Sequence, residues 1–248
     1  MIEVVNVNKS FGAQKVLNNL NLSIEKGRIT VIMGSSGGGK SVLLKHLIGL
    51  VRPDSGHVYV AGEDIANLSG KKLIALRKRF GMLFQEAALF DSMTVGENVA
   101  FPLKEHTRMK QNQIMEVVEK KLLQVGLSNV THKMPSQLSG GMRKRVGLAR
   151  AIALEPEIIL FDEPTTGLDP IMTDAINNLI RETQRLTGAT CAVISHDIAG
   201  AFKIADKIAM LYGGKIIGQG TPEEMRHSAD PIISQFIEGR ADGPISVV

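Results

Sequence analysis

A glycine-rich loop set between an apolar run and a helical pattern constrains this chain more than any other feature. Residues 34–41 read Gly-Ser-Ser-Gly-Gly-Gly-Lys-Ser, directly after the apolar residues 29–33 and before the helix-like residues 42–47. A strand, a glycine loop and a helix in this order predict a phosphate cradle. Glycines let backbone N–H groups converge on an anion, and the helix presents its positive N-terminal end to the same anion. With both flanks present, we favour this cradle over a plain glycine-rich turn.

The residue types in the loop predict individual contacts with a polyphosphate. Lys40 would reach the β- and γ-phosphates, and the Ser41 hydroxyl would be a ligand of Mg²⁺. The predicted nucleotide-binding residues of this segment are Gly34, Ser35, Ser36, Gly37, Gly38, Gly39, Lys40, Ser41 and Val42. A phosphate loop alone leaves many families open, from nucleotide kinases to GTPases.

Length and composition fit a globular α/β protein. The 248 residues are 44% hydrophobic, enough to bury the core of one large domain or of a domain with a subdomain. No apolar run approaches the roughly 18 residues of a membrane span, and the first six residues lack the basic start and apolar core of a signal peptide. We therefore expect a chain made and kept in the cytoplasm. The single cysteine, Cys191, lies in an apolar run and is predicted to be buried in a strand.

The basic charge of the chain leaves two kinds of partner to consider. The net charge is +4, and residues 77–79 and 143–145 are two basic runs. Such runs could meet nucleic acid or an anionic membrane surface, but on helices they are more often solvated faces. Aromatic residues are only 4% of the chain and tryptophan is absent, so few side chains could stack on bases. We expect no nucleic-acid partner.

Two patterns of apolar residues predict an α/β fold. Residues 2–7 and 20–24 alternate apolar and polar side chains, as half-buried antiparallel strands do. Residues 158–161 and 192–194 are continuously apolar, which is typical of a parallel sheet covered on both faces. Residues 89–154 show little strand character and begin with a capping box at Thr94 and Glu97, so they predict a helical insert. A further helix should begin at Thr221.

A pair of acids ends the apolar run 158–161. Asp162 and Glu163 would lie at the carboxyl edge of the sheet, where ligands bind in such folds. Asp162 fits an outer-sphere partner of Mg²⁺, and Glu163 fits a base or orienting group for an attacking water. Beside a phosphate loop, we favour this over two acids that simply end a strand at the surface.

A serine and two glycines before the last part of the helical insert identify a family. Ser139 can cap the helix that runs through Val146 and Ala149, and Gly140 and Gly141 would let a ligand approach that helix end closely. This segment lies about twenty residues before the acid pair, and in that position it resembles the signature sequence of ABC-type ATPases. Its fifth position is usually Gln and here is Met142.

Four more positions of the ABC pattern occur in the order that the family has. Phe11 would stack on adenine, Gln85 would touch Mg²⁺ and the attacking water, Asp169 matches the D-loop, and His196 matches the switch histidine that senses the γ-phosphate. Taken singly, Phe11 and His196 could be core residues, Gln85 a surface amide and Asp169 a turn residue. Their joint occurrence disfavours these structural alternatives.

The resemblance implies a P-loop NTPase fold with a RecA-like parallel sheet core, an N-terminal antiparallel β subdomain and an inserted helical subdomain. Residues 1–88 and 155–228 would be the core of a single nucleotide-binding domain, residues 89–154 the helical subdomain, and residues 229–248 a C-terminal helix and tail. Catalytic residues would be Glu163, His196 and Gln85, and the Mg²⁺ ligands Ser41, Gln85 and Asp162.

The resemblance also implies a homodimer that hydrolyses ATP, because one chain of this family cannot close its own site. Ser139, Gly140 and Gly141 of one chain would cover the ATP held by the phosphate loop of the other, and Asp169 would lie near the same nucleotide. Hydrolysis would reopen the dimer.

Within the family, residues 138–145, 77–85 and 98–107 resemble the ATPases of Mla/Mce-type phospholipid transporters. That implies a place on the cytoplasmic face of an inner membrane, beside a permease of the MlaE type, an Mce-domain subunit of the MlaD type and a STAS-domain subunit of the MlaB type. The alternatives are an ABC transporter for another substrate, such as amino acids, a soluble ABC ATPase that acts on DNA or ribosomes, and a non-catalytic regulatory module. A permease should contact residues 86–108.

Overall fold

The computed structural model describes residues 1–35 and 37–245, and the chain divides into two compact units. Unit 1 consists of residues 1–69 and 192–248, and unit 2 of residues 70–191. The predicted glycine loop belongs to unit 1, whereas the acid pair and the predicted signature belong to unit 2. The division into a core, a helical subdomain and a C-terminal tail stays a prediction.

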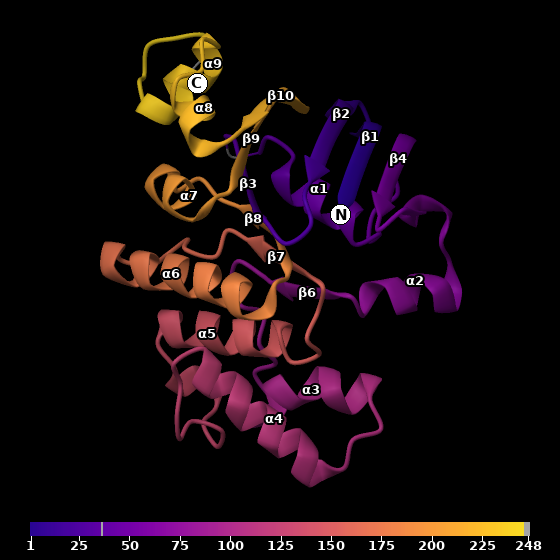
Figure 1. Cartoon of the computed structure of the whole chain (residues 1–248), viewed down its shortest axis with the longest axis vertical. Coiled ribbons are helices and arrows are strands. Elements are labelled where there is room, and N and C mark those ends of the chain that lie inside the picture. The colour runs from indigo at the N-terminus through magenta and orange to yellow at the C-terminus, as the bar shows by residue number, and fades with distance from the viewer. Residues whose placement is uncertain (36, 246–248) are drawn as a thin grey trace. The chain divides into compact units, whose positions relative to one another are not determined.

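Unit 1 begins with the antiparallel sheet that the alternating pattern predicts. Its strand order is β2-β1-β4-β5, and β2, β1 and β4 lie side by side in Figure 1. Ile2, Val4 and Val7 of the first strand are buried, while the residues between them are not fully covered. The strands are β1 (Ile2–Phe11), β2 (Gln14–Ile24), β4 (Ser55–Val60) and β5 (Glu63–Asp64), followed by the 3₁₀ turn η1 (Ile65–Asn67).

A second group of strands in unit 1 carries the glycine loop. β3 (Ile29–Met33) is buried throughout and pairs in parallel with β9 (Lys207–Tyr212), which pairs antiparallel with β10 (Lys215–Gly220). The loop after β3 leads into α1 (Lys40–Leu47), as the sequence predicts. The unit boundary falls within β8 (Thr190–Ile194), where Cys191 is buried as expected. At the end of β8, the Ser195 amide donates to the carbonyl of Ile32 at 3.3 Å.

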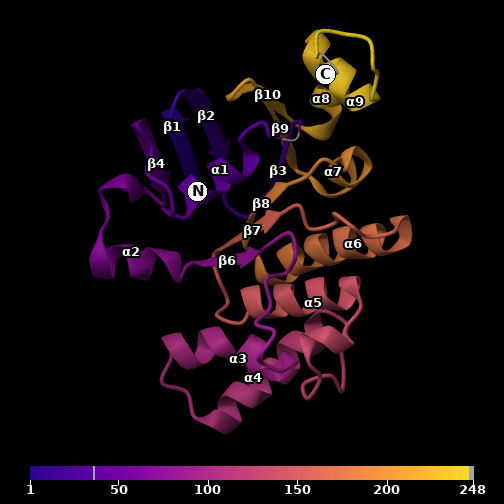
Figure 2. The same cartoon turned by 180° about the vertical axis from the view of Figure 1, so that it is seen from behind.

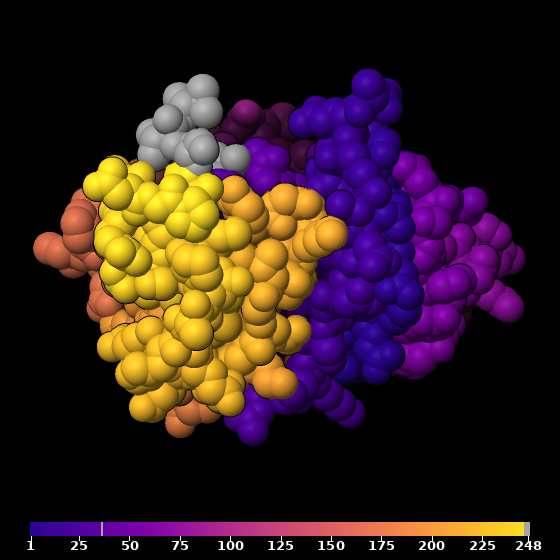
Figure 3. All heavy atoms as spheres, turned by 90° about the horizontal axis from the view of Figure 1, so that it is seen from above, coloured from indigo at the N-terminus to yellow at the C-terminus, as the bar shows by residue number. Residues whose placement is uncertain are grey.

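The C-terminal part of unit 1 contains three short helices. They are α7 (Ile198–Ile204), α8 (Pro222–Arg226) and α9 (Pro231–Glu238), and Figure 2 shows α8 and α9 beside each other. Thr221 and Glu224 form the capping box that the sequence predicts at the start of α8. Seen from above, the orange surface of this part adjoins the indigo N-terminal strands (Figure 3), and Gln219 Nε2 donates to the carbonyl of Ser23 at 2.6 Å.

Unit 2 combines a short parallel strand pair with helices. β6 (Phe80–Leu83) pairs in parallel with β7 (Ile158–Asp162), and the four apolar residues of β7 are fully buried. In Figures 1 and 2 alike, α5 lies between α6 and the pair formed by α3 and α4. The remaining elements are α2 (Gly70–Arg77), α3 (Val95–His106), α4 (Gln111–Gln124), the 3₁₀ turn η2 (Pro135–Gln137), α5 (Gly140–Ala151) and α6 (Pro170–Thr187).

The helical insert begins where its capping signal predicts, because the Thr94 hydroxyl accepts from the Glu97 amide and the Glu97 carboxylate accepts from the Thr94 amide. The basic run 143–145 differs from the solvated face that we expected. Lys144 is only 5% exposed, and Arg145 Nη1 donates to the carbonyl of Val125 at 2.8 Å. Both cations therefore hold backbone of unit 2 in place. Of the helices in the described residues, none has the length and apolar character needed to cross a bilayer.

Candidate functional site

The glycine loop of unit 1 has a backbone that side chains would obstruct. Gly37 and Gly39 have φ angles of +75° and +95°, which favour glycine. A Cβ on Gly34 would collide with the carbonyl oxygen of Leu211, and nothing lies within 4 Å of a Cβ built on Gly37. The loop is therefore tied to β9 at its start and open at its turn. Ser36, another predicted contact, lies outside the described residues.

Lys40 folds back across the loop from the first position of α1. Its Nζ donates to the carbonyls of Gly34 at 2.8 Å and Ser35 at 2.9 Å, and the side chain is nearly fully buried. Gly39 precedes the helix without a side-chain cap, and the first N–H groups of α1 point out of this helix end. An anion at this helix end would accept from those N–H groups and from the lysine. Ser41 is exposed and Val42 half-buried at the same end.

Phe11 and His196 are exposed, so neither is a core residue. Phe11 ends β1 and is 50% exposed, and Lys9 Nζ lies 5.4 Å from its ring centroid. A ring on the surface can stack on a nucleotide base, which a core phenylalanine cannot. His196 follows β8, just before Asp197, whose carboxylate accepts from the Gly200 amide and caps α7.

A cavity of about 350 Å³ in unit 1 brings the start of the glycine loop together with His196. Its lining includes Gly34, Ser35 and His196, together with Gln235, Arg240 and Ile245 from the C-terminal end. Asp230 and Pro231 give a sequence signal for the helix α9, since the aspartate caps it and the proline occupies its first position. No local pattern places that helix beside a phosphate loop, and the sequence reading did not assign these three C-terminal residues to the site.

The predicted hydrolytic residues of unit 2 lie at the ends of its two strands. Gln85 follows β6 and is exposed, Asp162 ends β7, and Glu163 comes next. Glu163 has φ +47°, a conformation that costs a non-glycine residue about 1–3 kcal/mol and persists only where the surrounding structure holds it. Thr166 holds it twice: the Thr166 amide donates to the Glu163 carbonyl at 3.3 Å, and Thr166 Oγ1 donates to Glu163 Oε2 at 3.0 Å.

The predicted signature lies at the N-terminus of α5. Ser139 caps this helix by accepting from the Met142 amide at 3.3 Å. A Cβ on Gly140 would lie 3.7 Å from Leu168 Cδ2, and a Cβ on Gly141 would collide with Cε of Met172. Gly141 therefore makes room for a side chain of α6, rather than only for a ligand. Asp169, between those two contacts, caps α6 by accepting from the amides of Ile171 and Met172.

The structure thus assembles the predicted residues in two groups. Unit 1 holds Phe11, the glycine loop and His196, and unit 2 holds Gln85, Asp162 and Glu163 together with the signature and D-loop residues. Ser41 of unit 1 and Gln85 and Asp162 of unit 2 each offer an oxygen atom, the kind of ligand that Mg²⁺ prefers. In the described part of the chain, no group of three or more His, Cys, Asp or Glu could hold a metal.

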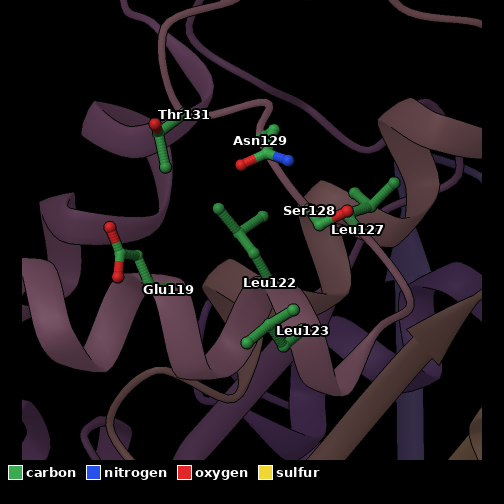
Figure 4. A pocket seen from close by; sticks show the side chains of 7 residues that line it. All are labelled: Glu119, Leu122, Leu123, Leu127, Ser128, Asn129 and Thr131. Atoms are coloured by element: carbon green, nitrogen blue, oxygen red, sulfur yellow. The ribbon is translucent and has the colours of Figure 1, made fainter.

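Another cavity in unit 2, of about 190 Å³, has none of the predicted site residues in its lining. It is formed by α4 and the segment that follows, and Figure 4 shows Leu122, Leu123 and Leu127 beside the polar side chains of Ser128, Asn129 and Thr131. Glu119 is its only ionisable lining residue. Its lining therefore offers no cluster of catalytic groups.

Comparisons with known proteins show which family the chain is similar to. A family model described as "ABC transporter" matches residues 17–166. The "Intermembrane phospholipid transport system ATP-binding protein MlaF" of Haemophilus influenzae is 45% identical over 99% of this chain and 93% of its own length. The "Probable ribonucleotide transport ATP-binding protein mkl" of Mycobacterium tuberculosis is 44% identical over 99% of this chain and 68% of its own length.

A solved structure extends the likeness to the fold. The ATP-binding cassette MJ0796, in a dimeric post-hydrolysis state bound to ADP and Pi, superposes with a TM-score of 0.82 at 33% identity. The match covers 90% of this chain and 99% of that one. The predicted α/β fold of a P-loop NTPase is confirmed by this likeness. The chain belongs to the ABC transporter family, as a subunit that hydrolyses ATP to drive transport.

Proposed function

We propose that this chain powers a transporter that moves phospholipid between the inner and outer membranes. The proposal rests on the match with MlaF of Haemophilus influenzae, which spans nearly the full length of both proteins: 99% of this chain and 93% of that relative. The mycobacterial relative named for ribonucleotide transport is almost as similar, but the match spans only 68% of its length. The reciprocal coverage favours the phospholipid system.

In the proposed reaction, a water attacks the γ-phosphorus of ATP, the bond to the β–γ bridging oxygen breaks, and ADP and phosphate leave. Lys40 and the first N–H groups of α1 hold the phosphates, and Glu163, Gln85 and His196 arrange the water. Ser41, Gln85 and Asp162 would hold Mg²⁺, which neutralises charge on the transferred group. Phe11 holds the adenine through its exposed ring.

A second copy of the chain would complete each site. Unit 2 presents the signature end of α5 and, close to it, the D-loop segment, where Asp169 is exposed and Ile171 is 81% exposed. An exposed apolar side chain in this segment would be covered by contact with another subunit. The dimeric state named for MJ0796 supports the same assembly. Ser139 of the partner subunit and Gly141 of the partner subunit would then cover the γ-phosphate.

An apolar groove in unit 2 is the proposed docking surface for the permease. It has a volume of about 310 Å³ and is lined by Phe84, Phe90, Phe101 and Pro102 among others. Phe84 and Phe90 are 39% and 42% exposed. Asn98, fully buried, fixes this wall by donating to the carbonyls of Phe90, Met93 and Thr94. A rigid aromatic groove suits a short amphipathic helix of a membrane partner.

The remaining subunits follow from the MlaF likeness. We place the chain at the cytoplasmic face of the inner membrane, attached through an MlaE-like permease, with an MlaD-like Mce-domain subunit and an MlaB-like STAS-domain subunit. The soluble ABC ATPases, which act on DNA or ribosomes, stay the rival class, and an amino-acid transporter stays the rival within the family.

Co-purification from native membranes tests this function. The tagged full-length chain is extracted in mild detergent, its partners are identified by mass spectrometry, and bound lipid is analysed by thin-layer chromatography. We expect a permease, an Mce-domain protein and phospholipid. Phe90→Ser, in the groove, should lose the permease, whereas Leu123→Ser, at an equally apolar exposed position outside it, should keep the permease. Recovery of an amino-acid permease, ribosomes or DNA would contradict the proposal.

A further inference from the structure

The proposed catalytic carboxylate of unit 2, Glu163, is held by Thr166, which lies three residues further along the chain. Thr166 Oγ1 donates to Glu163 Oε2 at 3.0 Å, and the Thr166 amide bonds to the carbonyl of Glu163. Glu163 keeps a φ of +47° although it precedes Pro164, where extended backbone is preferred. A strained residue keeps such a conformation only if its surroundings determine it. Thr166 is part of these surroundings, because it holds both the main chain and the side chain of Glu163.

Thr166 is in turn bonded to the helix that begins with the signature. Lys144 Nζ donates to the Thr166 carbonyl at 2.7 Å from within α5, and the lysine is 5% exposed. A buried ammonium group is costly unless it has acceptors, so this contact is specific rather than incidental. Lys144 lies five residues after Ser139, which caps the same helix. Lys144 thus belongs to the one continuous helix of 12 residues, α5, that Ser139 caps.

The charges around Lys144 belong to two other motifs. Burial lowers the pKa of the Lys144 ammonium, while the carboxylates of Glu86 and Glu163 oppose that shift. Glu86 follows Gln85 directly. Lys144 therefore lies within electrostatic reach of the segment after β6 and of the segment after β7, the two places that carry the hydrolytic residues of unit 2.

We propose that Lys144 and Thr166 are positioning residues, which hold the Glu163 carboxylate and connect its orientation to the helix that begins at Ser139. In a dimer, that helix end contacts the nucleotide of the partner, while Glu163 acts on the nucleotide of its own chain. The hydrogen bonds from Lys144 to Thr166 and from Thr166 to Glu163 thus connect the two sites. Through them, a nucleotide bound in one site would set the orientation of the Glu163 carboxylate in the other. This inference rests on the proposed function, in which each ATP site is a composite site, formed by the phosphate loop of one chain and the signature of the other.

Isosteric variants of Thr166 give the direct test. Thr166→Val removes the hydroxyl and keeps the volume and the carbonyl that accepts from Lys144, whereas Thr166→Ser keeps the hydroxyl. In steady-state ATPase assays of the full chain in its purified membrane complex, we expect Thr166→Val to lower kcat about tenfold with KM for ATP unchanged. Thr166→Ser should stay within about twofold of the unmodified chain, because it can still donate to Glu163.

Control variants separate positioning from folding. Thr187→Val removes a hydroxyl that donates to the Thr183 carbonyl at the end of α6, and it should leave kcat unchanged. Lys144→Met should lower kcat as Thr166→Val does. The kcat of the double variant should be no lower than that of the less active single variant, because both residues act through one chain of contacts. In a Glu163→Gln background, Thr166→Val should have no further effect on the residual rate.

The outcomes distinguish this inference from the proposed function. A Thr166→Val chain with the kcat of the unmodified chain, or with raised KM and unchanged kcat, overturns the positioning role while leaving the ATPase in place. A Thr166→Ser chain as slow as Thr166→Val also overturns it. If the unmodified complex hydrolyses no ATP, the proposed function fails and the inference fails with it. Lys144→Met can fail to fold, and the Thr166 pair then decides the question alone.

Discussion

His46 is a buried histidine on α1, the helix that follows the glycine loop. It is 0% exposed, its Nδ1 lies 2.7 Å from the carbonyl of Val42, and its Nε2 has no hydrogen-bond partner among the described residues. Burial lowers the pKa of His46, and this outweighs the opposite effects of the Val42 carbonyl and of Asp54. A charged ring at this buried site would lose its hydration, so the folded state disfavours the protonated form.

The free energy of unfolding should therefore depend on pH through His46. Above a pH of about 6.5 both states are neutral, and below it the unfolded chain takes up a proton that the folded chain does not. The His46 contribution to stability is thus complete above the unfolded pKa and declines, by up to about 1.4 kcal/mol per pH unit, as the pH falls towards the lowered folded pKa. Urea unfolding at pH 5.5 and 7.5 measures this decline.

His46→Leu is the matched variant, since it fills the same buried site without a titratable group. The difference in unfolding free energy between the two pH values should be smaller in His46→Leu than in the unmodified chain. The exposed histidines contribute equally to both chains and cancel in the comparison. An identical pH dependence would show that His46 is protonated in the folded state as readily as in the unfolded one.

At the scale of elements, α9 and the segment after it form a wall of the cavity that also contains His196. Gln235 of α9 is 3% exposed. Its Nε2 donates to the carbonyls of Arg240, Ala241 and Ile245 at 3.1–3.4 Å, and its Oε1 accepts from the Ile245 amide at 2.7 Å. A Cβ on Gly243 would collide with the Gln235 side chain, so the glycine is needed for this fold-back. One side chain thus holds the segment against the helix.

Gln235→Leu should release that segment while leaving the rest of unit 1 folded. Leucine fills a similar volume but makes none of the four hydrogen bonds, and the freed backbone groups can be hydrated because residues 240–244 are exposed. We expect faster tryptic cleavage after Arg240 in limited proteolysis followed by mass spectrometry, with a change in Tm of only a few degrees. Cleavage after Arg108, exposed between α3 and α4, is the internal control. Equal cleavage rates after Arg240 would contradict the holding role of Gln235.

The helix starts at Thr94, Ser139 and Thr221 were predictable because capping depends on residues three positions apart. The same locality explains why the glycine loop and its flanking strand and helix were found. The contacts from Lys144 to Thr166 and from Gln235 to Ile245 were not predicted, because they depend on how elements pack. The prediction that the basic run 143–145 forms a solvated face was wrong for the same reason. A pattern of charges in the sequence cannot distinguish a solvated face from a cation that is buried against a carbonyl.

At the scale of the whole molecule, composite sites predict complementation between two inactive chains. Lys40→Ala should disable the phosphate loop of a chain and spare its signature, and Ser139→Arg should do the reverse, because the two residues serve different nucleotides. A dimer that contains one chain of each kind has one intact site, made of the Ser139→Arg chain's loop and the Lys40→Ala chain's signature. Its second site combines both defects.

Mixing the two variants in equal amounts should restore up to about a quarter of the normal ATPase rate, since half of randomly formed dimers are mixed and each has one working site of two. Each variant alone should be nearly inactive. The mixture is assayed in the reconstituted membrane complex, with size-exclusion chromatography of differently tagged chains to confirm mixed dimers. A mixture of Lys40→Ala with Lys40→Ala/Ser139→Arg contains no intact site and controls for simple addition of residual rates. Mixed dimers without recovered activity would show either that each chain completes its own site or that one site cannot turn over alone, and both results exclude independently working composite sites.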